Sequence, residues 1–207
     1  MEKSVLFLDF DGLKFDTLPA HVHYLNQRYG IESKESDYIN NPSLEKVINA
    51  YLKTEKHITR EHAYTDLSEN FLSSLDWHAN VMLIEGAEKI IPLLAEKYIL
   101  WTVTARQKMG MHIIKYLHDM HLPNCISGIH CVWEHLGNGR YNEVSKRSFI
   151  EAFPAKKVAF IDDSAKEIIE LQDILPCYLF DRFKVNEHYP GIHNRVYSWE
   201  EIGNIFL

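Results

Sequence analysis

Short hydrophobic runs alternate with amphipathic segments over most of this chain. The first run, at residues 5–8, continues through two acidic residues to Gly12, which is typical of a buried parallel strand that opens onto a loop. From Gly86 onward, helix-like and strand-like segments alternate. Strands are predicted at 98–104, 129–133, 157–162 and 177–180, and helices at about 86–97, 107–120, 145–153, 164–174 and from Ser198. This alternation predicts an α/β fold with a Rossmann-like parallel sheet covered by helices on both faces.

A helical block separates the first strand from this alternating part. Residues 18–29 have a helical pattern that stops at Gly30, a typical C-terminal cap. Further helical patterns follow at 42–53 and 59–75, the latter with one apolar face. No strand is predicted in this block, so it is expected to form a separate helical layer.

We interpret this block, residues 15–83, as a small α-helical cap domain. It would be inserted into a core domain formed by residues 1–14 and 84–207, and 207 residues are enough for both. The hinges would then lie at 13–17 and 82–86. We expect this block to form a helical lid over the carboxyl ends of the core strands.

Composition narrows the class of protein. The formal net charge of −7 disfavours binding to a nucleic-acid polymer, which usually requires a broad basic surface. No apolar run approaches the roughly 20 residues of a membrane span, and the N-terminus has no signal-peptide pattern. The three cysteines form no CxxC pair, so we expect free thiols and a cytoplasmic location. The sequence leaves the oligomeric state open.

Acidic residues end two of the predicted strands. Asp9 and Asp11 are two positions apart, so on an extended backbone both side chains point to the same side. Two carboxylates that close repel one another unless a cation neutralises them or one holds a proton. Asp162 and Asp163 end a later strand. Because ligands bind at the carboxyl ends of such strands and Mg²⁺ prefers oxygen ligands, the pattern predicts a magnesium site there.

Two further features offer phosphate-binding groups. Thr104, Ala105 and Arg106 end a third predicted strand and present a hydroxyl and backbone N–H groups. Lys146 begins a helix and offers a point charge for a phosphate. We prefer Lys146 to Lys157, because Lys157 would lie at the amino end of its strand, away from the site.

Each feature also has a simpler explanation. Asp-x-Asp-Gly often marks an ordinary strand-to-turn transition, and Asp-Asp after a strand is often a helix cap. Their placement at the ends of strands in one sheet favours a functional site. The twelve histidines lack an HExxH motif or a third ligand, so we expect solvated or capping roles for them rather than zinc binding.

Taken together, the motifs resemble those of the haloacid dehalogenase (HAD) superfamily of phosphohydrolases. Residues 5–12 match its first motif, a hydrophobic strand followed by Asp-x-Asp-Gly, and residues 99–104 match its second, a strand ending in Thr. Lys146 loosely matches the third motif, and residues 158–163 match the fourth, a strand followed by Asp-Asp. The position of the cap between the first two motifs is similar to the subgroup with helical caps.

This resemblance implies a magnesium-dependent phosphatase. Asp9 would attack phosphorus and carry the covalent phosphoryl group, while Asp11 would act as general acid and base. Mg²⁺ would be held by Asp9, the backbone carbonyl of Asp11, Asp162 and Asp163, and Lys146 would offset phosphoryl charge. The substrate would be a small phosphomonoester.

The C-terminal third has a second, weaker resemblance. Residues 179–181, Asn186 and residues 195–202 resemble deoxyribonucleotidase-like members of the superfamily, which implies a nucleoside monophosphate as one candidate substrate. The alternatives are a phosphomutase of the same superfamily and a binding protein on this scaffold that has lost turnover. The retained Asp11 argues against the last of these.

Overall fold

The computed structural model describes residues 3–30, 32–39, 65–137 and 140–207. Its centre is a seven-stranded sheet with the strand order β6-β5-β4-β1-β7-β8-β9. The strands are β1 (Val5–Leu8), β4 (Ile99–Gln107), β5 (Ile126–Gly137), β6 (Arg140–Glu143), β7 (Lys157–Asp162), β8 (Cys177–Phe180) and β9 (Arg195–Val196). All neighbouring pairs are parallel except β5 with β6. The predicted parallel α/β sheet is confirmed.

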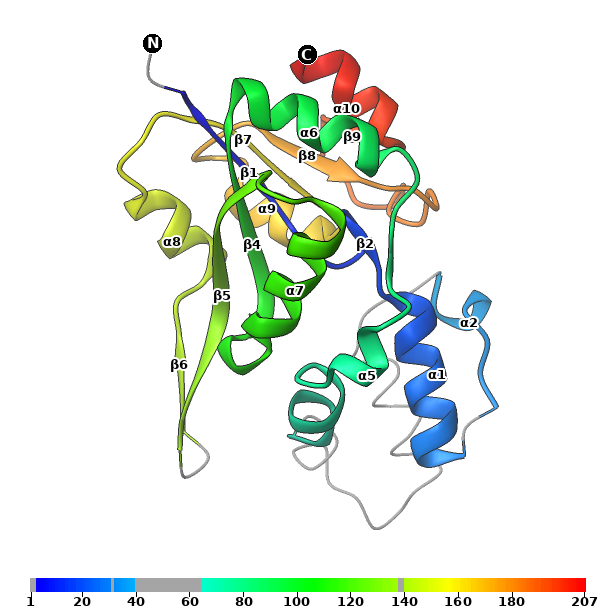
Figure 1. Ribbon diagram of the computed structural model, residues 1–207. Helices are drawn as coiled ribbons and strands as arrows, with labels where there is room; N and C mark the ends of the chain where they lie inside the picture. The colour runs from blue at the N-terminus through cyan, green and yellow to red at the C-terminus, as the bar shows by residue number, and fades with distance from the viewer. Residues whose placement is uncertain (1–2, 31, 40–64, 138–139) are drawn as a thin grey trace.

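Five α-helices cover the two faces of this sheet (Figure 1). They are α6 (Ala87–Lys97), α7 (Met111–His121), α8 (Lys146–Ala152), α9 (Ala165–Leu171) and α10 (Trp199–Phe206). Apolar residues of α6, α7 and α10 share one core cluster, and those of α8 and α9 share another. The predicted coverage of both faces is therefore confirmed.

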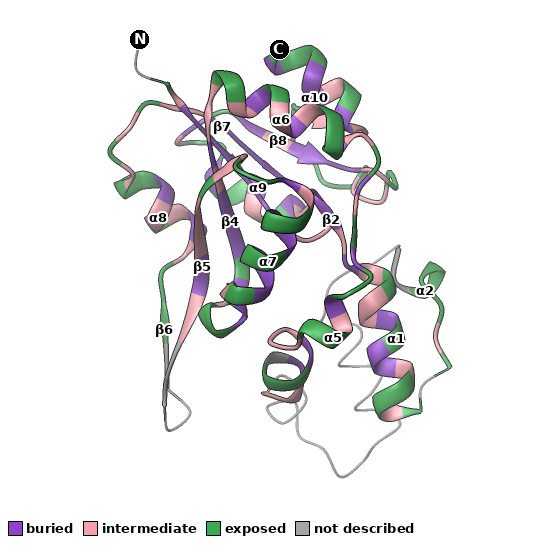
Figure 2. Cartoon of the chain, in the orientation of Figure 1, coloured by how far each residue is buried: buried purple, intermediate pink, exposed green. Residues whose placement is uncertain are grey.

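The position of β1 in the middle of the sheet explains why its sequence is continuously apolar. Leu6 and Leu8 belong to one core cluster, whereas Val5 and Phe7 belong to the other. All four side chains are fully buried (Figure 2). A strand with two buried faces cannot alternate polar and apolar residues, so it appears as an uninterrupted hydrophobic run.

The helices of the predicted cap are set apart from the sheet (Figure 1). Helix α1 (Leu18–Tyr29) ends at Gly30 as predicted, and the positive φ of 64° at Gly30 suits a residue without a Cβ. The described elements that follow are α2 (Ser36–Ile39), the π-helix η1 (Leu67–Phe71) and α5 (Leu75–His78). A small apolar cluster joins α1 to η1: Val22, Tyr24, Leu25, Leu67 and Phe71.

Two predicted cap helices are only partly testable. The one at 42–53 and residues 59–64 of the next lie outside the described residues. The prediction of one helix continuing to residue 75 is wrong, because η1 ends at Phe71 and α5 begins at Leu75. The division into a cap at 15–83 and a core stays a prediction.

The expectation of no strand in the 15–83 block is wrong at both ends. Strand β2 (Phe15–Asp16) pairs antiparallel with β3 (Met82–Leu83), so the two linkers form a short ribbon. Strands of two residues leave no alternating pattern in the sequence. Strand β9 also has only two residues and leaves no such pattern. Strand β6 is an edge strand that pairs antiparallel with β5, and its polar residues give no hydrophobic run in the sequence.

The remaining composition-based expectations concern thiols and membranes. Cys125, Cys131 and Cys177 are free thiols, as expected. Among the described residues, every helix is too short or too polar to cross a bilayer.

Candidate active site

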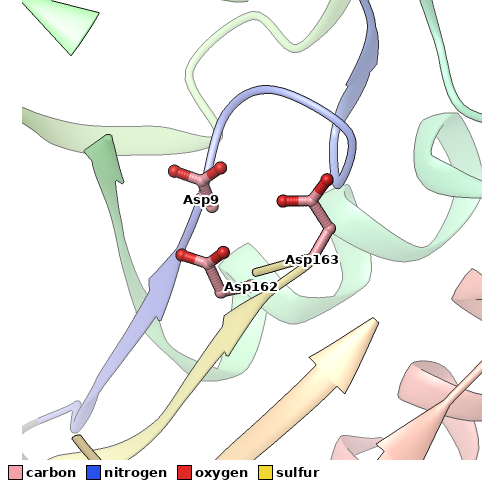
Figure 3. A group of neighbouring side chains, drawn as sticks. All are labelled: Asp9, Asp162 and Asp163. Carbon is pink, nitrogen blue, oxygen red and sulfur yellow. The ribbon is translucent and has the colours of Figure 1, made fainter. Parts of the chain in front are cut away.

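Three carboxylates meet at the carboxyl ends of β1 and β7 (Figure 3). Asp9 follows β1, Asp162 is the last residue of β7, and Asp163 comes next. Because β1 and β7 are parallel neighbours, their carboxyl ends lie at the same edge of the sheet. Carboxylate oxygens of the three residues lie within 4.8 Å of one another. The structure therefore brings together three of the four acidic residues that the sequence placed at two separate strand ends, the exception being Asp11.

Lys146 lies against this acidic cluster. It is the first residue of α8, where the Ser145 hydroxyl caps the helix by accepting from the Ser148 N–H. Its ammonium donates to Asp9 Oδ1 at 2.9 Å and to Asp162 Oδ2 at 2.6 Å, and the side chain is buried. Burial alone would lower the pKa of Lys146, but the charges of Asp162 and Asp9 raise it above its ordinary value. Lys146 is thus a cation at this site.

The cluster carries more negative charge than Lys146 offsets. Burial, with repulsion from Asp162 and Asp11, raises the pKa of Asp9 to about 7 despite the attraction of Lys146. Burial and the charges of Asp162 and Asp9 raise the pKa of Asp163 well above its usual range. A divalent cation would relieve this repulsion. The donor set consists of oxygen atoms only and therefore fits Mg²⁺.

Gly12 allows the loop after β1 to approach the cluster. Its φ is 67°, and a Cβ at this position would lie 2.0 Å from Asp163 Oδ2. Only glycine fits both the backbone conformation and the contact. The glycine of the Asp-x-Asp-Gly motif is therefore required by the position of Asp163.

Asp11 has a different set of partners. Arg106 donates two hydrogen bonds to the Asp11 carboxylate, from Nε at 2.8 Å and from Nη2 at 2.7 Å. The Thr17 hydroxyl donates a third at 2.7 Å. Burial by itself would raise the pKa of Asp11, but Arg106 lowers it below its ordinary value. Strand β1 ends at Leu8, so the geometry of an extended strand does not continue to Asp11. The side chain of Asp11 lies outside the three-carboxylate cluster, and the role of its backbone carbonyl as a metal ligand stays a prediction.

The segment from Thr104 to Arg106 is not the end of its strand. Strand β4 continues to Gln107, and the Thr104 hydroxyl accepts from the Arg106 N–H at 3.3 Å. Ala105 is exposed, whereas Arg106 is buried with its guanidinium directed at Asp11. Binding of phosphate by Thr104, Ala105 and Arg106 stays a prediction.

Two buried histidines contradict the expectation that histidines are solvated or capping. His118 lies in the core, where its Nε2 is 3.4 Å from the Thr102 hydroxyl. His78 of α5 accepts from Arg106 through Nε2 at 3.1 Å, and its Nδ1 donates to the Ser74 carbonyl. Since arginine only donates, the Arg106 contact fixes this tautomer. His78 therefore links helix α5 to the pair formed by Arg106 and Asp11.

The burial of Lys14 was also not predicted from the sequence. Its side chain is fully buried, and its ammonium donates to Thr102 Oγ1 at 2.5 Å. Burial lowers the pKa of Lys14 to about 7. A lysine beside an apolar turn gives no sequence signal of burial, because lysine is almost always exposed.

The neutral state of His78 predicts that stability falls in mild acid. Burial and the charge of Arg106 lower its pKa to about 4, below the unfolded value of 6.5. Its other charged or titratable neighbours include Asp11, His112 and His21. As pH falls below 6.5, this imidazole is protonated in the unfolded chain but stays neutral in the folded chain until the pH approaches about 4. Its contribution to the free energy of unfolding is therefore complete above pH 6.5 and is lost as the pH falls from 6.5 towards 4. We expect the free energy of unfolding to be about 2 kcal/mol lower at pH 5 than at pH 7 from this group alone.

Denaturant titrations at both pH values measure this loss. His78→Gln keeps an acceptor for Arg106 but does not titrate, so the loss between pH 7 and pH 5 should shrink by about 2 kcal/mol. An unchanged loss in this variant would contradict the assignment to His78.

Comparisons with known proteins find similarity in structure. No family model and no curated protein sequence matches the chain. It is similar to a predicted phosphatase from Clostridium acetobutylicum (16% identity, 99% and 98% of the two chains covered, TM-score 0.69). It is also similar to a HAD-superfamily hydrolase of subfamily IA, variant 1, from Geobacter sulfurreducens (14% identity, 99% and 97% covered, TM-score 0.65).

A third similar structure was solved with magnesium. It is the HAD-type protein YfnB from Bacillus subtilis (18% identity, 100% and 99% covered, TM-score 0.62). At these identities the similarity establishes architecture, and it spans nearly the whole of each chain. The chain has the fold of the HAD-superfamily hydrolases, as its sequence motifs indicated.

Proposed function

We propose that this chain is a magnesium-dependent phosphatase that hydrolyses a small phosphomonoester through a phospho-aspartate on Asp9. The observation that carries the proposal is the cluster of Asp9, Asp162 and Asp163 with Lys146 at the strand ends. Its surplus of buried negative charge calls for a cation, and its fold is shared with phosphatases. The three free cysteines are consistent with action in the cytoplasm.

Asp9, Asp162 and Asp163 would hold the magnesium ion, together with the backbone carbonyl of Asp11. When bound, the ion supplies positive charge that offsets the charge of the phosphoryl oxygens. Lys146 supplies a second positive charge beside Asp9. Since Lys146 also contacts Asp162, it holds the two carboxylates in a fixed relation.

Asp9 is the proposed nucleophile. Its hydrogen bond to Lys146 occupies Oδ1 and orients the side chain. A carboxylate oxygen of Asp9 forms a bond to phosphorus while the bond from phosphorus to the ester oxygen breaks. Water then attacks the phospho-aspartate, which releases phosphate and restores the carboxylate.

Asp11 is the proposed general acid and base. It would give a proton to the leaving oxygen and later accept one from the attacking water. Arg106 and Thr17 hold Asp11 as a carboxylate in this structure. Asp11 therefore has to leave Arg106 before it can carry a proton. Because His78 of the cap also binds Arg106, this release involves contacts between cap and core.

Phosphate release from an aryl phosphate tests the proposal. We expect release that stops when divalent ions are chelated and resumes when Mg²⁺ is added back, because carboxylate oxygens select this hard ion. Colorimetric assay of free phosphate measures it. Restoration by zinc alone would contradict the proposed site, and transfer of phosphate within a sugar bisphosphate without net release would instead identify a phosphomutase.

A further inference from the structure

The turn between η1 and α5 lies directly against the segment that leads into α7. This turn consists of Leu72, Ser73 and Ser74. A Cβ at Gly110 would lie 2.7 Å from the Leu72 carbonyl oxygen, so the two backbones are in contact there. Helix α7 packs on the sheet, whereas α5 belongs to the helices set apart from it (Figure 1). The turn is therefore a point where these two parts of the fold meet.

Two histidines contact adjacent carbonyl groups of this turn. His78 of α5 donates through Nδ1 to the Ser74 carbonyl at 2.9 Å. His112, in the first turn of α7, has its Nε2 3.1 Å from the Ser73 carbonyl oxygen. Of these two contacts, the one made by His112 crosses from α7 to the turn.

The imidazole of His112 also faces a second carbonyl oxygen. Its Nδ1 lies 2.9 Å from the carbonyl oxygen of Met109. A backbone carbonyl only accepts hydrogen bonds, and a neutral imidazole has a single N–H. A neutral ring could therefore satisfy one carbonyl only, and its other nitrogen would direct a lone pair at an oxygen. The imidazolium donates to both, so the geometry at His112 is that of a protonated ring.

Loss of the proton would release the Ser73 contact rather than the Met109 contact. Met109 is three positions before His112, so the Nδ1 contact closes a short loop of chain and orders little else. Ser73 is 39 positions away and belongs to a separate element. A neutral ring that keeps the local contact presents a lone pair of Nε2 to the Ser73 oxygen. Because His112 is exposed, its ring exchanges protons with water.

The two histidines of the turn are suited to different protonation states. Burial, the charge of Arg106 and, to a smaller extent, that of His112 lower the pKa of His78 to about 4 and keep it neutral. Other charged or titratable groups on the elements around His112 are Lys108 with its partner Glu134, Lys115 and Tyr116 of α7, Glu69 of η1 and Asp76 of α5. Since both signs of charge are present, the two carbonyl contacts are the specific reason for a proton on His112.

We propose that His112 is a pH-sensitive latch: its protonated ring fastens the turn at residues 72–74 to α7, and its neutral ring releases that turn. An imidazole is the side-chain group that ordinarily changes charge between pH 5 and 8, so the latch acts in the physiological range. Helix α5 follows the turn and carries His78, whose partner Arg106 binds Asp11. The latch thus holds an element that reaches the candidate site, and the inference does not depend on the proposed phosphatase function.

Hydrogen exchange of the full chain tests the latch without any substrate. The Leu72 and Ser74 amides donate to carbonyls of η1 at 2.8 and 3.1 Å, so they report when the turn loosens. We expect their protection factors, corrected for the intrinsic pH dependence of exchange, to be about fivefold higher at pH 5.5 than at pH 8. Folded His78 stays neutral over this range, because its pKa is about 4. Equal protection at both pH values would overturn the proposal.

His112→Gln assigns the effect to this histidine. Glutamine does not titrate, and position 112 is exposed, so the variant should fold and its protection factors should be the same at both pH values. His193→Gln is the matched control, because His193 is another exposed histidine and lies between β8 and β9. This control should keep the wild-type response. A fivefold response that persists in His112→Gln would overturn the assignment.

The ring nitrogens of His112 provide a direct readout of the latch. Nitrogen–proton correlation NMR spectra distinguish an imidazolium, in which both nitrogens carry protons, from a neutral ring. We expect the His112 ring to lose its proton over the same pH interval in which protection of the Leu72 and Ser74 amides falls. Two separate midpoints would overturn the proposal, because protonation of His112 would then not be what fastens the turn.

Discussion

Asp9→Asn should abolish phosphate release while the protein stays folded. An amide oxygen is a poor nucleophile and cannot form the phospho-aspartate, so we expect kcat to fall on the order of 10⁴-fold or more. The fold should persist, because asparagine has the same size and removes a carboxylate whose raised pKa reports unfavourable burial and repulsion. Phosphate release at saturating Mg²⁺ measures the change, and circular dichroism checks the fold.

A covalent intermediate gives the same prediction a second readout. Acid quenching during turnover should trap a phosphoryl group on the wild-type chain, and peptide mass spectrometry should locate it on Asp9. Asp173→Asn is the control, since Asp173 forms an exposed ion pair with Arg147 and does not belong to the carboxylate cluster. An Asp9→Asn variant that keeps most of its activity would show that the nucleophile lies elsewhere.

The parts of the site that sequence could predict are those fixed by strand ends. The β1 residues are buried on both faces, so their hydrophobic run marks a central strand and places Asp9 beyond its end. The β7 run places Asp162 in the same way. Parallel pairing of these neighbours then brings the acids together. The helix that begins at Lys146 was expected from the alternation of helices and strands, although the contact of Lys146 with both carboxylates needed the structure.

The parts that sequence missed depend on contacts across distant segments. The pair of Asp11 and Arg106 joins residues 95 positions apart. It forms because β4 extends past Thr104 with a register irregularity beside β5, which no local pattern indicates. His78 joins this pair from α5, and its burial cannot be deduced from a four-residue helix. The state of the proposed acid is therefore a tertiary property of this fold.

The cavity beside Asp11 shows the same limit. Its lining joins residues of α1 to residues of the loop after β8, and these segments lie far apart in the sequence. Motifs at strand ends are visible in the sequence, whereas such a lining is set by tertiary contacts.

Lys146→Met should produce the second large loss. Methionine is similar in length but removes the charge that contacts Asp9 and Asp162, so kcat should fall by roughly 10²- to 10³-fold at saturating Mg²⁺. Without metal, two buried carboxylates would lose their cation, which costs about 3–5 kcal/mol of unfolding free energy. Added Mg²⁺ should therefore stabilise the variant more than the wild type, as measured by thermal melting.

Lys157→Met is the matched control for this prediction. Lys157 begins β7 at the end away from the acidic cluster, and its ammonium donates to the Glu151 carbonyl. Removing it should leave phosphate release and the response to Mg²⁺ unchanged. If Lys157→Met were inactive and Lys146→Met active, the lysine of the site would be misassigned. If both stayed active, charge compensation at Asp9 would come from the metal alone, and Lys146 would serve only to bridge Asp9 and Asp162 in the folded chain.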